Sequence, residues 1–449
     1  MNRSLPSNSN LTQLKHQAKD LLKAHERSNT RVCETLRLLR RFADAPDGEI
    51  LSANLSLHEA QFAVALDYGF SSWNALKHHL EGGRMPSAGR LVRQDGRVWI
   101  DGIPELAYGR SGVTTYAGAL EAALAVTSHP YSYDDIMGYT GLAFRTRWYR
   151  RLDTPGWCPS SAVGEMGPEI RKTEAATGWR FELIHRMERE DDPHMEDFSE
   201  QMASAIESGL PVVGYSNRRI LDCAVAHGCE RRSDGIYFLW QGYNEDQSGW
   251  KHEKETGPQQ LIITEHDSPA DERVSLRRAF TEDWRQRALP ANNPAKDVEA
   301  EYRYGAHALE TWADDLAHHD DFTEEQRGKL FFVSWFAHST LICARAAAAR
   351  FLTQHAQTAQ GDVADALRRA ATLYGETSAL VKKAQKEGAF GLPFGPQARD
   401  KWTPQARQLE IETLQSVQQR DATAERELDL ALKALEAELP PRVEESRAR

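Results

Sequence analysis

The sequence predicts an α+β fold in which a central segment with an antiparallel sheet is flanked on both sides by helical segments. Before residue 84 and after residue 291, apolar residues recur at helical spacing. Between these limits, short apolar runs alternate with turn residues, which is typical of strands. Helices first and antiparallel strands afterwards indicate an α+β domain. We therefore expect three domains, which cover residues 1–84, 90–290 and 291–449.

Residues 1–84 are expected to form a small helical module. Leu11, Leu14, Ala18, Leu21 and Leu22 repeat at helical spacing. Ser56 and Glu59 predict a capping box, and Gly69 predicts the end of the helix that the box begins. The stretch LHEAQFAVALDYGFSSWNALKHHL (residues 57–80) resembles a helical module attached to glyoxalase-like and ankyrin-repeat proteins. Its charge is close to balanced, with 11 basic and 9 acidic residues, so nucleic-acid binding is not favoured.

The central segment begins after a linker that contains Gly83, Pro86, Ser87 and Gly89. A short strand is expected at residues 97–100 and an apolar helix at 117–126. Asp134 and Asp135 suit the first turn of a further helix, where acidic side chains are favoured by the helix dipole. Further strands are expected at 211–215, 224–227 and 236–240. The last two flank a polar turn and predict an antiparallel hairpin.

The C-terminal segment is expected to be a helical bundle. Helical patterns cover residues 304–316, 331–352, 363–374 and 407–439. The last pattern places leucines at helical spacing, and Pro440 and Pro441 predict its end. His338 lies within the apolar pattern and is expected to be a core histidine.

Composition excludes several classes of protein. The net charge is −11, and no run of about 18 apolar residues predicts a membrane span. The first residues lack the apolar core of a signal peptide, so we expect a cytoplasmic protein with no membrane association. The acidic balance favours a cationic or amine-bearing partner over a polyanion. Five cysteines without a CxxC pair do not suit a disulfide framework or a zinc site. Phe62 occupies the second histidine position of an HExxH motif, and phosphate-binding and dinucleotide-binding glycine motifs are missing, so no metal or cofactor is expected.

Four strings of the central segment carry a family resemblance: TTYAGALEAAL (114–124), YSYDDIMGYTGLAFR (131–145), WCPSSAVGEMG (157–167) and GLPVVGY (209–215). Together they resemble the butirosin biosynthesis protein H N-terminal family, which is similar to the papain-like peptidase domain of bacteriocin-processing transporters. The resemblance implies a papain-like domain with a nucleophilic cysteine at the start of a helix and a histidine on a strand. The cysteine position falls on Thr115, or on Thr114 after a shift of one residue. The histidine position falls near Asp222 and Cys223, while His227 lies at the far end of the strand.

Other residues are candidates in addition to those at the implied cysteine and histidine positions. Cys158 is either a displaced nucleophile or an inert core thiol. Glu121, two turns into the helix, is either a general base or a solvated side chain. Arg145 either clamps an anion or pairs with Glu165 or Glu169. The candidate catalytic residues are therefore Thr115, Asp222, Glu121 and Cys158, and the candidate binding residues are Arg145, Glu165, Tyr116 and His227.

Two functions follow from the resemblance. The first is a binding or regulatory protein that lacks the Cys/His dyad. The second is an acyl or amide transferase of specialised metabolism, with an amine-bearing acceptor and a small-molecule or carrier-protein substrate. In the second case, a carboxylate such as Glu121, Glu165 or Asp222 would deprotonate the amine. The sequence does not predict an oligomeric state.

Overall fold

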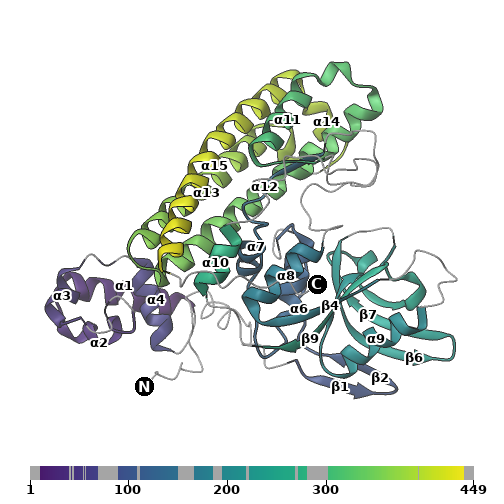
Figure 1. Cartoon of the computed structure of the whole chain (residues 1–449), viewed down its shortest axis with the longest axis horizontal. Coiled ribbons are helices and arrows are strands. Elements are labelled where there is room, and N and C mark those ends of the chain that lie inside the picture. Colours follow the sequence, from purple (N-terminus) through teal and green to yellow (C-terminus); the bar gives the residue numbers. More distant parts are fainter. Residues whose placement is uncertain are drawn as a thin grey trace. The chain divides into compact units, whose positions relative to one another are not determined.

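The computed structural model describes residues 11–39, 42, 45–53, 55, 57–68, 89–108, 112–149, 166–185, 195–218, 222–267, 272–280, 302–392 and 394–438 (Figure 1). The chain divides into two compact units, Met1–Ser87 and Ala88–Arg449. The expected boundary near residue 291 falls outside the described residues. The α+β class and the helical C-terminal segment are both confirmed.

The first unit is helical, as expected. Its described elements are α1 (Leu11–Glu26), η1 (Thr30–Val32), α2 (Cys33–Leu36), α3 (Asp47–Ser52) and α4 (Leu57–Asp67). Leu14 and Ala18 of α1 are buried against Val64 and Ala65 of α4. His25 Nε2 donates a hydrogen bond of 2.8 Å to the Ile50 carbonyl and so links α1 to α3. Ser56 and Gly69, which we expected to bound α4, lie outside the described residues.

The second unit contains an eight-stranded antiparallel sheet. Its strands are β1 (Leu91–Gln94), β2 (Arg97–Ile100), β4 (Trp179–His185), β5 (Val212–Tyr215), β6 (Cys223–Arg232), β7 (Gly235–Gln241), β8 (Gly249–His252) and β9 (Gln259–His266). The main path runs β1-β2-β6-β5-β9-β4, while β7 pairs with β6 and β8. The predicted hairpin is confirmed as β6–β7, with a register shift between Ala226 and Gly228. The polar turn η3 (Glu245–Gln247) precedes β8 and η4 (Glu253–Glu255) follows it.

Helices cover both faces of this sheet, which is why β5 is buried along its whole length. α6 (Thr115–Leu124), α8 (Met166–Thr177) and α9 (Met195–Glu207) pack against the strands, while α7 (Tyr133–Tyr139) and α10 (Glu272–Phe280) pack against α8 and the bundle. Val212 packs with Phe198 and Met202 of α9, and the neighbouring Val213 belongs to the core around α6. Because successive side chains of a strand point to opposite faces, α9 and α6 lie on opposite sides of the sheet.

The bundle consists of α11 (Gly305–Ala317), α12 (Glu324–Thr358), α13 (Gly361–Glu387), α14 (Pro396–Lys401) and α15 (Pro404–Glu438), with short turns η7 (His319–Asp321) and η8 (Ala389–Gly391). The four predicted helices are confirmed as α11, α12, α13 and α15, and Figure 1 shows the long ones running side by side. A two-stranded sheet of β3 (Arg147–Tyr149) and β10 (Tyr302–Tyr304) connects the α+β part to α11. By length and composition α12 is apolar enough to cross a membrane, but 56% of its most apolar stretch is buried inside the fold.

The sheet-covering helices and the bundle share one core. Phe144 and Met137 belong to the same buried cluster as Phe351 of α12 and Leu428 of α15. Gly138 of α7 permits this close packing, because a Cβ atom there would lie 2.3 Å from the Phe351 ring. Ser132 and Asp135 form a capping box at the start of α7, as the acidic residues of this segment led us to expect.

Arg345 of α12 lies at the centre of this shared region and is 2% exposed. Its Nε and Nη2 atoms donate to Asp421 Oδ2 of α15 at 3.0 and 2.6 Å. Its Nη1 atom donates to the Ala143 carbonyl at 3.0 Å, and Nη2 also donates to Thr146 Oγ1 at 2.6 Å. One buried guanidinium therefore joins α12, α15 and the segment after α7.

We expect Arg345→Met and Asp421→Asn each to lower the free energy of unfolding by about 3–5 kcal/mol, because each leaves a buried charge without its partner. Urea unfolding followed by circular dichroism measures this. The matched control is Arg369→Met, which breaks the pair between Arg369 of α13 and Glu427 of α15 near the surface. This change should lower the free energy of unfolding by about 1 kcal/mol or less. Equal losses for Arg345→Met and Arg369→Met would contradict the central role of Arg345.

Candidate functional site

The candidate site surrounds the start of α6, where a sharp turn directs the chain into the helix. Gly112 has a φ of +75°, and a Cβ atom there would lie 2.2 Å from the Tyr133 ring. Thr114 is extended, with φ −85° and ψ 95°, so the helix begins at the next residue. The Thr114 amide donates to the Tyr133 hydroxyl at 3.3 Å. Tyr133 of α7 therefore positions the residues that begin α6.

Thr115 and Asp222, the two positions implied by the resemblance, lie next to each other. Thr115 Oγ1 accepts the amide of Cys223 at 3.1 Å, and the nearby Thr115 hydroxyl acts to lower the pKa of the Asp222 carboxyl. The Tyr108 hydroxyl donates to Asp222 Oδ2 at 2.6 Å. Burial raises the pKa of Asp222, while the hydrogen bonds from Tyr108 and Thr115 oppose this shift. Thr115 itself is 1% exposed, so its hydroxyl is enclosed by the fold.

Aromatic and amide side chains surround Asp222. The rings of Tyr108 and Tyr243 have centroids 4.8 Å apart, and Tyr108 is 47% exposed. Gln247 Nε2 donates to the Asp222 carbonyl at 3.3 Å. Burial raises the pKa of the Cys223 thiol, which keeps this neighbour protonated and unreactive. The site has one accessible carboxylate beside an exposed aromatic ring.

Tyr116 and His227 are committed to other contacts. The Tyr116 hydroxyl lies 3.4 Å from Thr173 Oγ1 of α8 and is fully buried. His227 Nδ1 donates to the Ile100 carbonyl of β2 at 3.0 Å. Burial lowers the pKa of His227, which favours the neutral imidazole. The structure therefore places the His227 imidazole against β2, and the group beside Thr115 is Asp222.

Glu121 is the one residue of α6 that is not buried. Its Oε1 atom accepts the amide of Tyr133 at 2.9 Å and so caps the start of α7. The pKa of Glu121 is raised to about 7, chiefly by burial and also by Asp134 and Asp135, while the Tyr133 amide and Arg350 oppose the shift. A carboxyl group with this pKa exchanges its proton near neutral pH, as a general acid or base requires.

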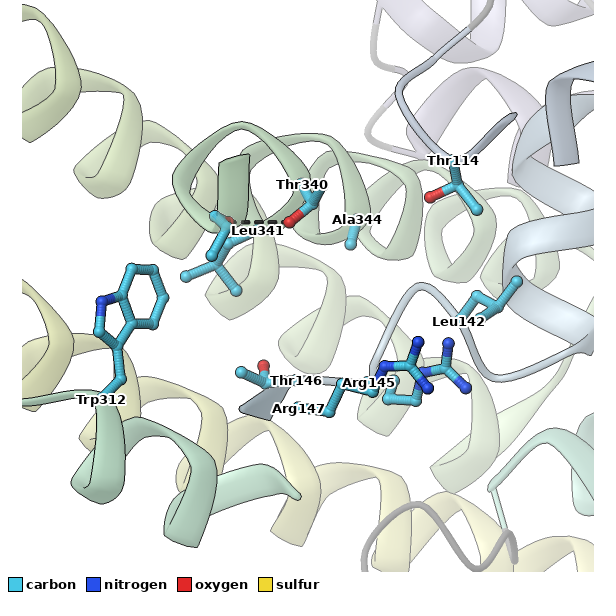
Figure 2. A pocket seen from close by; sticks show the side chains of 10 residues that line it. Thr114, Leu142, Arg145, Thr146, Arg147, Trp312, Thr340, Leu341 and Ala344 are labelled. Carbon is cyan, nitrogen blue, oxygen red and sulfur yellow. Dashed lines mark hydrogen bonds between the residues drawn. The ribbon is translucent and has the colours of Figure 1, made fainter. Parts of the chain in front are cut away.

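Arg145 pairs with Glu169, one of the two acidic partners expected for it. Arg145 Nη1 lies 2.8 Å from Glu169 Oε1, and both side chains are largely buried, at 9% and 5% exposure. Arg145 also lines a pocket between the segment after α7 and the bundle, shown in Figure 2. The pocket is lined by Thr114, Leu142, Arg145, Thr146, Arg147, Trp312, Ala337, Thr340, Leu341 and Ala344. Cys158 and Glu165 lie outside the described residues.

Within the described part of the chain, no group of three or more His, Cys, Asp or Glu side chains is arranged to hold a metal ion. His338, expected to be a core histidine, is 2% exposed, and its Nε2 atom lies 3.3 Å from Glu410 Oε1. The two atoms meet the distance of an ion pair but not the geometry of a hydrogen bond. We therefore interpret His338 as part of the bundle core.

No family model matches the chain, and no curated protein matches it either.

Three residues that shape the site were not singled out from the sequence. Tyr108 lies in a segment without a periodic pattern, Arg147 follows the string YSYDDIMGYTGLAFR but was given no role of its own, and Arg345 lies in an alanine-rich helix. A lone arginine within an apolar helical pattern is the one signal that could have indicated a buried ion pair.

The pKa of Glu121 predicts a pH-dependent stability. In the folded protein this pKa is about 7, above the ordinary value of 4.5. Between these values the folded state keeps the proton that the unfolded state has lost, so the free energy of unfolding falls as the pH rises. We expect Glu121→Gln to remove this fall. As the pH rises from 4 to 8, the free energy of unfolding of the variant should therefore increase relative to that of the unmodified protein, on the order of 1–3 kcal/mol.

Urea midpoints measured at several pH values test this expectation. Glu376→Gln, a change at an exposed position of α13, is the matched control and should give parallel profiles. An unchanged pH profile in the Glu121→Gln variant would show that Glu121 titrates as an ordinary surface carboxyl.

Proposed function

We propose that this chain is a binding or regulatory protein with a papain-like α+β domain and without peptidase chemistry. One observation carries the proposal: Thr115, at the position of the implied nucleophile, is 1% exposed, and its hydroxyl oxygen already accepts the Cys223 amide. A nucleophile must reach a substrate carbonyl at about 3–3.5 Å. An enclosed hydroxyl with its hydrogen bonds occupied has no such approach.

The neighbouring groups support the same reading. A threonine hydroxyl needs an adjacent base to become a nucleophile. The usual base, a histidine, is replaced in this position by Asp222, and His227 is bonded to Ile100. The Tyr108 and Thr115 hydroxyls stabilise Asp222 as an acceptor. We interpret Thr115 and Asp222 as a structural connection between α6 and β6.

A second candidate function, an acyl or amide transferase, is favoured by the accessible carboxylates. The Asp222 carboxylate forms no ion pair with a basic side chain in the described part of the chain, and Tyr108 presents an exposed ring beside it. A carboxylate beside an aromatic face suits a cationic amine. In transfer, the amine nitrogen would attack a thioester carbonyl, the thiolate would leave, and Glu121 or Asp222 would accept the amine proton.

For the binding function, we expect no hydrolysis of an N-acetylcysteamine thioester or a fluorogenic peptide above the buffer rate. Thr115→Ala should leave these rates unchanged and lower the free energy of unfolding by about 1–3 kcal/mol, because the Cys223 amide and Asp222 lose a partner. Thr115→Ser keeps the hydroxyl and serves as control. Hydrolysis that is abolished in Thr115→Ala but kept in Thr115→Ser would overturn the proposal.

The transferase candidate is tested by adding an alkyl diamine to the same thioester and detecting the amide by mass spectrometry. If this candidate is right, amide forms, and Glu121→Gln or Asp222→Asn lowers its rate by about 100-fold or more without changing the circular dichroism spectrum. Glu376→Gln is again the matched control. Absence of amide, or a rate in both variants equal to that of the unmodified protein, would reject this candidate.

A further inference from the structure

Four aromatic side chains form a cluster at the surface of the bundle, which we call the aromatic patch. Phe332, Trp335 and Phe336 belong to the first half of α12, and Phe394 lies between η8 and α14. The ring centroid of Phe394 lies 5.3 Å from that of Phe332 and 5.5 Å from that of Trp335. Phe332 is 41% exposed and Phe394 is 51% exposed. Exposed aromatic side chains that contact one another mark a surface where another molecule binds.

The fold beneath the patch holds its side chains in place. Phe394 stacks on the buried ring of Phe331 with a centroid distance of 5.7 Å. The Trp335 Nε1 atom donates a hydrogen bond of 3.3 Å to the Leu392 carbonyl, which connects α12 to the segment that carries Phe394. A surface that is ordered before binding loses little conformational entropy when a partner covers it.

The exposed side of α12 has the spacing of a seam between two helices. Starting from Glu325, positions 329, 332, 336, 339 and 343 follow at alternating intervals of four and three residues, and all six are exposed or half-buried. Residues at these intervals lie along one stripe of a helix, as they do in paired helices. Phe332 and Phe336 occupy the centre of this stripe. The stripe therefore suits contact with another helix.

Charges of opposite sign lie at the two ends of the stripe. At its start, Glu325 is 81% exposed, and its 3.1 Å contact with Lys329 is a solvated surface pair. At its far end, burial raises the pKa of the Cys343 thiol, and the charges of Arg350 and Lys382 oppose this shift, so both cations lie near Cys343. Arg350 is paired with α7. Lys382 is exposed and forms no ion pair with any residue that the structure describes.

These features make the stripe complementary to a second copy of itself. In an antiparallel pair of α12 helices, positions at equal distances from a two-fold axis face each other. An axis at position 334 sets Phe332 of each copy against Phe336 of the other, as an isologous contact requires. The same axis sets position 325 opposite position 343. Glu325 of one copy then faces Lys382 of the other, so apolar and charged groups both find matching partners.

We propose that the aromatic patch is the interface of a homodimer, in which a second copy of this chain packs its α12 antiparallel across Phe332 and Phe336. Trp335 and Phe394 would flank this seam. An apolar centre with charged groups at its rim is the usual arrangement of a protein interface. The proposal uses none of the residues around Asp222, so it does not rest on the binding function proposed above.

Sedimentation velocity of the full-length protein over a series of concentrations tests the proposal. We expect an equilibrium between monomer and dimer. Phe332→Glu should raise the dissociation constant of the dimer by about tenfold or more, because it places a carboxylate at the centre of an apolar interface. Leu430→Glu is the matched control, since Leu430 of α15 is 50% exposed and lies outside the patch. This control should dimerise as the unmodified protein does.

An exchange of charges tests the register of the two helices. Glu325→Lys and Lys382→Glu should each weaken the dimer, because each brings like charges together across the interface. A chain that carries both changes restores the opposite charges and should regain dimerisation. Circular dichroism and melting temperatures establish that the variants are folded.

Three kinds of result would overturn the proposal. The first is a monomer at every concentration, or a dimer that tolerates Phe332→Glu. The second is single charge variants that dimerise normally, or a loss of dimer that the double variant does not reverse. The third is a monomer that binds phosphatidylserine vesicles through Phe332, because the patch would then contact a lipid surface and not a second copy.

Discussion

The buried charge of Arg345 is the constraint on which the second unit depends. A guanidinium that is 2% exposed must have its hydrogen bonds met by protein groups, because water does not reach it. The three groups that meet them come from two segments: the Asp421 carboxylate from α15, and the Ala143 carbonyl and the Thr146 hydroxyl from the segment after α7. Neither of these segments can move away without leaving a cation unpaired in the core. The packing of the bundle against the α+β part is therefore specified by an ion pair and not by apolar contact alone.

The same constraint determines the geometry of the candidate site. Thr146 is held by Arg345, and its neighbours Arg145 and Arg147 are thereby positioned along one wall of the pocket. Tyr133 holds the amide of Thr114, and Glu121 holds the amide of Tyr133, so α6 and α7 position each other's first residues. A chain built in this way keeps a precise arrangement at the start of α6 whatever the role of the residue at position 115. In the binding function proposed above, the proximity of Thr115 and Asp222 serves stability and not catalysis.

The sequence predicted the elements whose pattern is local. The β6–β7 hairpin follows from two apolar runs around a polar turn, and α12 and α15 follow from long helical periodicity. It did not predict β4 and β9, because their exposed faces carry charged residues such as Glu182 and Glu265 that interrupt the apolar pattern. It also did not predict the contact of Arg345 with Asp421, since a pairing across 76 residues leaves no local signal. At the site, the adjacency of Thr115 and Asp222 was implied by the resemblance, whereas the roles of Tyr108 and Tyr133 depend on loops without periodicity.

The net charge of −11 favoured a cationic partner, whereas buried charges near the start of α6 are already paired inside the fold, as Arg145 is with Glu169. The two statements concern different distances. Exposed charges are screened over about 8–10 Å at physiological salt, so a net charge describes how a molecule attracts or repels partners before contact. A buried charge interacts chiefly with the few groups in contact with it, as Arg345 does with Asp421. Net charge therefore bears on what approaches the surface, whereas the groups in contact at a site decide what can bind there.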